Sequence, residues 1–199
     1  MKIMLNARAA KPDAMIGGGD AVHPGPAGHT LMAWTILKQL NAPALVSACG
    51  IDVSCWFFLS KVVCQKNCDV SNVKVKDGTL SFDRLDHALP MPVDARAAAA
   101  LALAPVSEDL NRYMLKVAGL EAAQYQLSID GLKVAVFSRE QLAQGVNLAT
   151  VATPNSAQAL QVLDLVFKKN DVYFERWRKV QLADGPAEKL AELDKRIAE

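Results

Sequence analysis

Two Asp-Gly turns constrain the fold of this chain more than any other sequence feature. Residues 70–76 and 79–83 alternate in polarity on either side of Asp77-Gly78, and the same pattern surrounds Asp130-Gly131. Asp-Gly between two alternating segments is a strong signal for a β-hairpin with a two-residue turn. The sequence therefore predicts about five short antiparallel strands, the remaining ones lying at 113–117, 125–129 and 133–137.

Helices are predicted around these strands from capping residues and apolar residues with a 3.6-residue period. Asp94, Ser138 and Thr153 have the side chains and positions of N-caps, and Gly145 ends one helix. The predicted helical ranges are 1–12, 26–40, 95–103, 139–143, 153–182 and 188–198. Strands covered by helices on one face indicate an α+β fold.

The longest predicted helix opens at Thr153-Pro154 and runs to about Leu182. Its apolar side consists of Leu160, Leu163, Val166, Phe167, Tyr173, Trp177 and Val180. Arg176-Trp177-Arg178 is interpreted as a buried tryptophan between two charges that reach water, and a ligand clamp is the alternative. In the last helix we expect Glu192 to face Arg196.

Composition and charge exclude several classes of protein. Apolar residues make up 51% of the 199 residues, which is enough for the core of an ordinary domain. The net charge of +1 gives no electrostatic support for nucleic-acid binding. No apolar run reaches the ~18 residues expected of a membrane span, and residues 1–5 lack the longer apolar region of a signal peptide. We therefore expect a soluble protein, in a compartment that the sequence does not specify.

The candidate catalytic residues are Asp20 and His23. They lie three positions apart in a loop before a Pro/Gly turn and the helix predicted at 26–40. A carboxylate this close can accept the Nδ1 hydrogen of a histidine and leave Nε2 as a general base. Such a dyad needs a nucleophile as its third member.

Asp20-x-x-His23-Pro24, followed by Gly28-His29 and a helix with Met32-Ala33, resembles the last motif block of the SGNH (GDSL-type) ester hydrolases. Further similar segments follow in order at 110–113, 125–131, 137–138, 142–149 and 176–178. The resemblance implies a Ser-His-Asp triad with His23 as base and Asp20 as its orienting acid. It also implies hydrolysis of an ester, with a carbohydrate ester as the expected substrate, through an acyl-serine intermediate and without a cofactor or metal.

The nucleophile block of that family is not found in this sequence. Only nineteen residues precede Asp20, and neither Gly-Asp-Ser nor Gly-x-Asn-Asp occurs anywhere in the chain. The expected organisation is therefore the end of an α/β SGNH core at 1–43, a small antiparallel β-rich subdomain at 44–152 and helices at 153–199. We expect such a chain to be inactive alone. The alternative is a non-catalytic β-rich accessory or interaction module.

The other histidines and the glycine-rich segment are expected to have structural and not catalytic roles. Asp20, His23 and His29 could together bind one metal ion, but the dyad explains the first two more simply. His29 is expected to make a structural hydrogen bond to the loop, and His87 to lie at the surface. The glycines at 17–19 are expected to form a flexible loop, because no strand precedes them and no lysine follows in the position of a phosphate-binding loop.

Four cysteines, Cys49, Cys55, Cys64 and Cys68, lie within twenty residues. Their separations of five, eight and three intervening residues fit no common zinc pattern. We expect free buried thiols, with disulfides and zinc as the alternatives.

The apolar stripe of the helix at 26–40 would pack on a sheet in an intact SGNH core. Leu31, Trp34 and Leu37 are expected to face that sheet, which this chain does not encode. An uncovered stripe of this kind predicts self-association through this helix.

Overall fold

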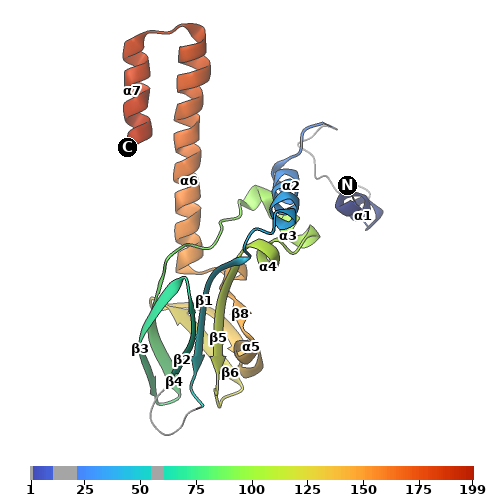
Figure 1. The fold of residues 1–199 in the computed structure, drawn as a ribbon, viewed down its shortest axis with the longest axis vertical. Coiled ribbons are helices and arrows are strands. Elements are labelled where there is room, and N and C mark those ends of the chain that lie inside the picture. The colour runs from blue at the N-terminus through green and yellow to red at the C-terminus, as the bar shows by residue number, and fades with distance from the viewer. Residues whose placement is uncertain (1, 11–21, 55–60) are drawn as a thin grey trace. The chain divides into compact units, whose positions relative to one another are not determined.

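The computed structural model describes residues 2–10, 22–54 and 61–199 (Figure 1). The chain divides into two compact units, residues 1–157 and residues 158–199. The three-part division expected from the sequence remains a prediction. Helices and small sheets are both present, so the fold is α+β.

The first unit is built on a mixed four-stranded sheet in the order β2-β1-β5-β8. Its strands are β1 (Leu45–Asp52), β2 (Lys61–Lys66), β5 (Arg112–Ala118) and β8 (Val146–Asn147). β2 and β8 run antiparallel to their neighbours, whereas β1 and β5 are parallel. The expectation of antiparallel strands only is therefore wrong at this pair.

Both predicted hairpins are confirmed. β3 (Cys68–Lys76) pairs with β4 (Thr79–Asp86), and β6 (Gln124–Ile129) pairs with β7 (Leu132–Ser138). Asp77 and Asp130 adopt positive φ angles of 48° and 50°, which Asp tolerates better than most residues. Each Asp is followed by a glycine that also has a positive φ, as a primed hairpin turn requires.

Alternate residues of the hairpins and of the sheet form one core. Inward residues of β1 and β5 make its buried centre, and residues from both hairpins pack around them. In Figure 1, hairpin β3–β4 lies beside β2 and β1, and α5 (Arg139–Gln144) lies against β5. The fully packed side chains are those of Cys49, Ile51, Cys68, Tyr113, Leu115, Val117, Leu142 and Leu148.

A second, smaller core joins the helices of this unit. α2 (Pro26–Gln39) packs against η1 (Ala95–Ala97), α3 (Ala99–Leu103) and α4 (Val106–Leu110). Ala27 and Leu31 are buried there, against small side chains of α3. Leu31 was expected to be uncovered, and this expectation is wrong because the short helices supply the missing partner surface. α1 spans Lys2–Ala10 and, as expected, ends before Pro12.

The predicted helix caps are present. The Asp94 side chain accepts from the Arg96 N–H, and Ser138 forms a capping box with Gln141. Thr153 Oγ1 accepts from the Ser156 N–H at 3.0 Å, at the start of α6 (Pro154–Phe174). η2 (Leu148–Thr150) lies between β8 and this helix.

The second unit is helical. α6 continues through η3 (Glu175–Val180) and η4 (Gln181–Ala183), and α7 (Ala187–Ala198) packs on η3. Trp177 is 43% exposed and stacks under Arg178, so its predicted burial is wrong. Most of the apolar side predicted for this helix is exposed as well, and the buried residues of this unit are Ala159, Val180 and Leu193. Arg176 forms an ion pair with Asp194, and Glu192 pairs with Lys189 instead of Arg196.

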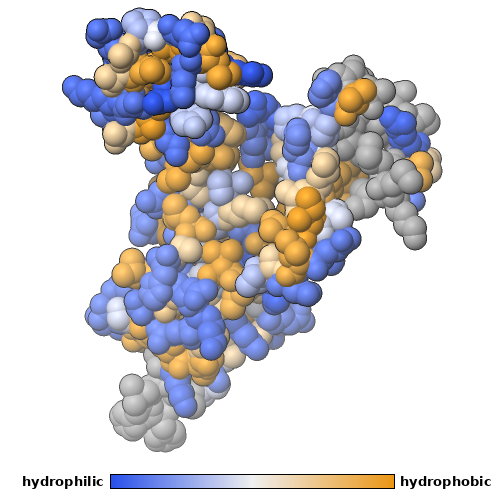
Figure 2. Space-filling model, turned by 45° about the horizontal axis from the view of Figure 1, so that its top comes forward, coloured by the Kyte–Doolittle hydropathy of each residue, from blue (hydrophilic) through white to orange (hydrophobic). Residues whose placement is uncertain are grey.

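Among the described residues, no helix is both long and apolar enough to cross a membrane. Figure 2 shows apolar side chains at the surface, interrupted by hydrophilic ones, on the face that it draws. The most exposed large apolar side chains of the first unit include Val22, Leu40, Leu85 and Leu132.

Candidate functional site

His23 is exposed and lies three residues before α2. Gly25 occupies the N-cap position with an extended backbone, and Pro26 begins the helix. The His29 N–H closes the first turn by donating to the Gly25 carbonyl at 2.9 Å, while its side chain is exposed. Asp20 and the glycines at 17–19 lie outside the described residues, so the dyad remains a prediction.

Two side chains from the middle and the C-terminal part of α2 contact Asp109 of α4. Trp34 Nε1 donates to Asp109 Oδ2 at 3.0 Å, and Lys38 Nζ lies 2.6 Å from the same oxygen. The Lys38 ammonium and the indole N–H hold the pKa of Asp109 below its ordinary value. α2 is thereby tied to α4, and the position of the His23 loop follows from that of α2.

The described cysteines, Cys49, Cys64 and Cys68, are free thiols, and Cys55 lies outside the described residues. Burial raises the pKa of the Cys49 thiol to about 11, so it is neutral near pH 7. A neutral buried thiol is neither a nucleophile nor a metal ligand. No cluster of potential metal ligands occurs within the part of the chain that the structure describes.

His87 is exposed, as expected. Its Nε2 lies 2.9 Å from Asp69 Oδ2, at the open end of hairpin β3–β4. This pair is solvated and remote from the turn of the hairpin.

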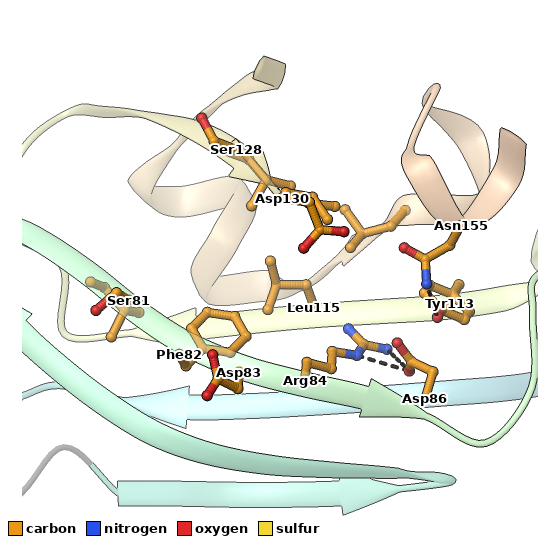
Figure 3. A pocket seen from close by; sticks show the side chains of 14 residues that line it. Ser81, Phe82, Asp83, Arg84, Asp86, Tyr113, Leu115, Ser128, Asp130 and Asn155 are labelled. Carbon is orange, nitrogen blue, oxygen red and sulfur yellow. Dashed lines mark hydrogen bonds and ion pairs between the residues drawn. The ribbon is translucent and has the colours of Figure 1, made fainter. Parts of the chain in front are cut away.

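The structure contains a cleft that the sequence did not reveal. It has a volume of about 560 Å³ and lies between β4 and the β6–β7 turn, with β5 at its base (Figure 3). Its apolar lining residues are Leu80, Phe82, Leu115, Leu127, Ile129 and Leu148. Its polar lining residues are Ser81, Asp83, Arg84, Asp86, Tyr113, Ser128, Asp130 and Asn155.

One end of the cleft is formed by a buried ion pair. Arg84 Nε donates to Asp86 Oδ1 at 2.9 Å, and both side chains are at most 10% exposed. The guanidinium also donates to Ser47 Oγ at 3.0 Å and to the Met114 carbonyl at 3.1 Å. Ser47, which is fully buried, donates in turn to Asp86. The pair is thus hydrogen-bonded on several sides, as buried charges require.

Tyr113 and Asn155 extend this network into the cleft. The centroid of the Tyr113 ring lies 4.8 Å from the Arg84 guanidinium carbon. Burial and the Asp86 carboxylate raise the pKa of Tyr113, so the phenol stays protonated at neutral pH. Asn155 Nδ2 donates to the Tyr113 hydroxyl at 3.1 Å.

The residues of this network are scattered over the sequence. The local signal for them is weak: Arg84 and Asp86 continue the inward-facing positions of Leu80 and Phe82 along β4. Two opposite charges on the apolar face of a strand indicate a buried pair, but nothing in the sequence points to Tyr113 or Asn155 as its partners.

Comparison with known proteins identifies an enzyme with the same fold. No family model matches the chain, and no curated protein matches it. A solved structure described as a gut microbial diltiazem-metabolizing enzyme superposes with a TM-score of 0.77 and 26% sequence identity. The match covers 100% of this chain and 49% of the other, so this chain spans about half the length of that enzyme.

Proposed function

We propose that this chain is the part of an SGNH (GDSL-type) ester hydrolase that carries the histidine and acid of a Ser-His-Asp triad, with a carbohydrate ester as its substrate. The match over the whole chain to an enzyme about twice as long supports the coarser part of the proposal, that this chain is part of a longer enzyme. The Asp20-x-x-His23 motif supports it independently.

In the proposed mechanism, His23 Nε2 takes the proton of a serine hydroxyl as that oxygen attacks the ester carbonyl. His23 then gives the proton to the leaving alcohol, and an acyl-serine forms. Water, deprotonated by the same histidine, attacks the acyl-serine; the histidine then gives that proton to the serine oxygen as the acid leaves, which restores the serine hydroxyl. Asp20 orients the imidazole and stabilises its charged form. The serine and the oxyanion donors come from a segment outside this sequence, and the exposure of His23 supports such an arrangement.

The first test uses the chain of 199 residues alone. We expect it to hydrolyse p-nitrophenyl acetate no faster than free imidazole at the same concentration. Without a serine, the histidine can only activate water, and covalent catalysis and the oxyanion hole are both lost. A burst of nitrophenol stoichiometric with the protein would contradict the proposal.

The second test uses a polypeptide in which a segment with a Gly-Asp-Ser block precedes this chain. His23→Ala should lower kcat/KM on a sugar acetate by far more than tenfold, and Asp20→Asn should lower it less, since His23 makes both proton transfers. His87→Ala is the matched control, because this exposed histidine pairs with Asp69 and should leave activity unchanged. If His23→Ala retains more than about a tenth of the activity, a loss of under ~1.4 kcal/mol, His23 is not the base.

The alternative, a non-catalytic module, is favoured by one observation. The β-rich part has a cleft of its own, lined by apolar walls and a buried polar network. The volume of this cleft falls in the range of small-molecule sites. If the longer polypeptide shows no hydrolysis that depends on His23 while the cleft binds a ligand, the module is the better description.

A further inference from the structure

The cleft of the β-rich part has the volume of a site for a small organic molecule, and its lining is both apolar and polar. Ligand sites usually enclose about 300–1,000 Å³ and combine apolar walls with a few polar groups. The cleft described here encloses about 560 Å³. Apolar side chains from β4, β5 and β6 face one another across it, which suits a ligand with a flat apolar body.

Arg84 gives the cleft no net positive charge. Its guanidinium is paired with Asp86 and also donates to Ser47 and to the Met114 carbonyl. A cation that is already neutralised and hydrogen-bonded attracts an added anion weakly. The network therefore closes one end of the cleft without making it a site for a carboxylate or a phosphate.

The hydrogen bond to Tyr113 fixes the orientation of the Asn155 side-chain amide. Asn155 Nδ2 donates to the Tyr113 hydroxyl at 3.1 Å, so the phenol oxygen is the acceptor in this contact. Asn155 must then present its amide oxygen elsewhere. In Figure 3 this oxygen points away from Tyr113 and into the cleft.

Asp130 supplies a second acceptor from the opposite side. It lies in the β6–β7 turn, and Figure 3 shows its carboxylate directed towards the space above Leu115. No cation pairs with Asp130 among residues 2–10, 22–54 and 61–199. Asp83, by contrast, accepts from Asn72 on the neighbouring strand.

We propose that this cleft binds a small organic cation, a molecule with an apolar ring system and a protonated amine. The ring system lies between Phe82, Leu127 and Leu115. The ammonium donates to the Asp130 carboxylate, and the amide oxygen of Asn155 accepts a further hydrogen bond from the ligand. Both groups accept hydrogen bonds, and an ammonium provides several donors and the opposite charge.

The test compares three ligands with one ring system and different charges: naphthylmethylamine, naphthylmethanol and naphthylacetate. Each is titrated into the whole isotope-labelled chain, and binding is followed by the NMR shifts of backbone amides. We expect the amine to bind about fivefold more tightly than the alcohol, as a solvent-accessible ion pair allows, and the carboxylate to bind most weakly. The shifts should map to β4, to the β6–β7 turn and to the start of α6.

Asp130→Asn and Asp77→Asn form a matched pair of variants. Both aspartates lie in two-residue turns before glycine with nearly equal φ angles, and Asn tolerates this conformation equally well. Both variants remove one negative charge from the molecule, but only Asp130 lines the cleft. We expect Asp130→Asn to abolish the preference for the amine over the alcohol, and Asp77→Asn to leave it intact.

The proposal is overturned if no ligand binds at millimolar concentration, if the carboxylate binds as tightly as the amine, or if the two variants behave alike. Shifts that map outside the cleft would overturn it as well. These measurements detect binding and not turnover, so their outcome is independent of the proposed ester hydrolysis.

Discussion

At Arg84 the protein holds a positive charge away from water, between β4 and β5. Its side chain is 10% exposed and that of its partner Asp86 is 7% exposed. Arg84→Met would leave the carboxylate buried without its cation, a change that typically costs about 3–5 kcal/mol. We expect a loss of this order in the free energy of unfolding, measured by urea denaturation.

The control for Arg84→Met is Lys168→Met. Lys168 pairs with Asp164 on the surface of α6, and both side chains are more than half exposed. Loss of a solvated pair changes stability little. Equal destabilisation by the two substitutions would show that the Arg84 pair contributes no more than a surface contact.

Tyr113 makes stability depend on alkaline pH. Because burial raises the pKa of its phenol in the folded state, the folded protein keeps a proton that the unfolded chain releases near pH ~10. The stabilisation is complete below that pH and is lost as the pH rises further. We expect the free energy of unfolding to fall above pH ~10, and less steeply in Tyr113→Phe. Tyr173→Phe, at an exposed position, should retain the wild-type slope.

The roles of Asp130 and Asn155 in the cleft do not follow from their local sequence. Asp130 was identified as a turn residue because Asp-Gly has a local conformational meaning. The direction of its carboxylate, towards the space above Leu115, depends on where β5 lies. β5 pairs with β1 and not with a strand of the β6–β7 hairpin, so the turn sequence carries no information about this position. Asn155 was recognised only as part of a helix start. Its contact with Tyr113 joins positions that no local pattern connects.

Among the elements, α5 shows how a few capping contacts define a short helix. Ser138 accepts from the Gln141 N–H, and the Gln141 side chain accepts from the Ser138 N–H at 2.8 Å. Ser138→Ala removes one half of this box and should destabilise the protein by about 1 kcal/mol. Ser71→Ala, on an exposed position of β3, is the control. Equal urea midpoints for the two variants would contradict the role of the box.

Elements with local signals were predicted well. The two hairpins, the caps at Asp94, Ser138 and Thr153, and the end of α5 at Gly145 all follow from contacts within a few residues. The central sheet was not predicted correctly. Its parallel pair joins β1 to β5 across β2, the hairpin β3–β4 and the short helices η1, α3 and α4, and strand order over such a distance is set by packing.

At the scale of the whole molecule, α2 still presents apolar residues to solvent. Leu31 is buried and Trp34 is tied to Asp109, but Met32, Ile36 and Leu40 are 54%, 55% and 72% exposed. We propose that the chain self-associates through these side chains. Light scattering should report a species larger than the monomer at micromolar concentration, and the double substitution Met32→Lys with Ile36→Lys should reduce it.

Val75→Lys is the control for self-association. Val75 is equally exposed at 55%, but it lies on β3. This variant should associate like the wild type. Two results would show that α2 is not the contact surface: a monomeric wild-type chain, or an equal decrease in the size of the associated species when Val75 is replaced by Lys.

The parallel pairing of β1 with β5 has a consequence for how the protein reaches its native state. The hairpins β3–β4 and β6–β7 close over two-residue turns and can form within about 1–10 μs. β1 cannot pair with β5 until the long intervening segment has been synthesised and compacted, which is a slow step of high contact order. During that interval the apolar faces of both hairpins are open to other chains. The yield of native protein after dilution from urea should therefore fall as the protein concentration during refolding rises.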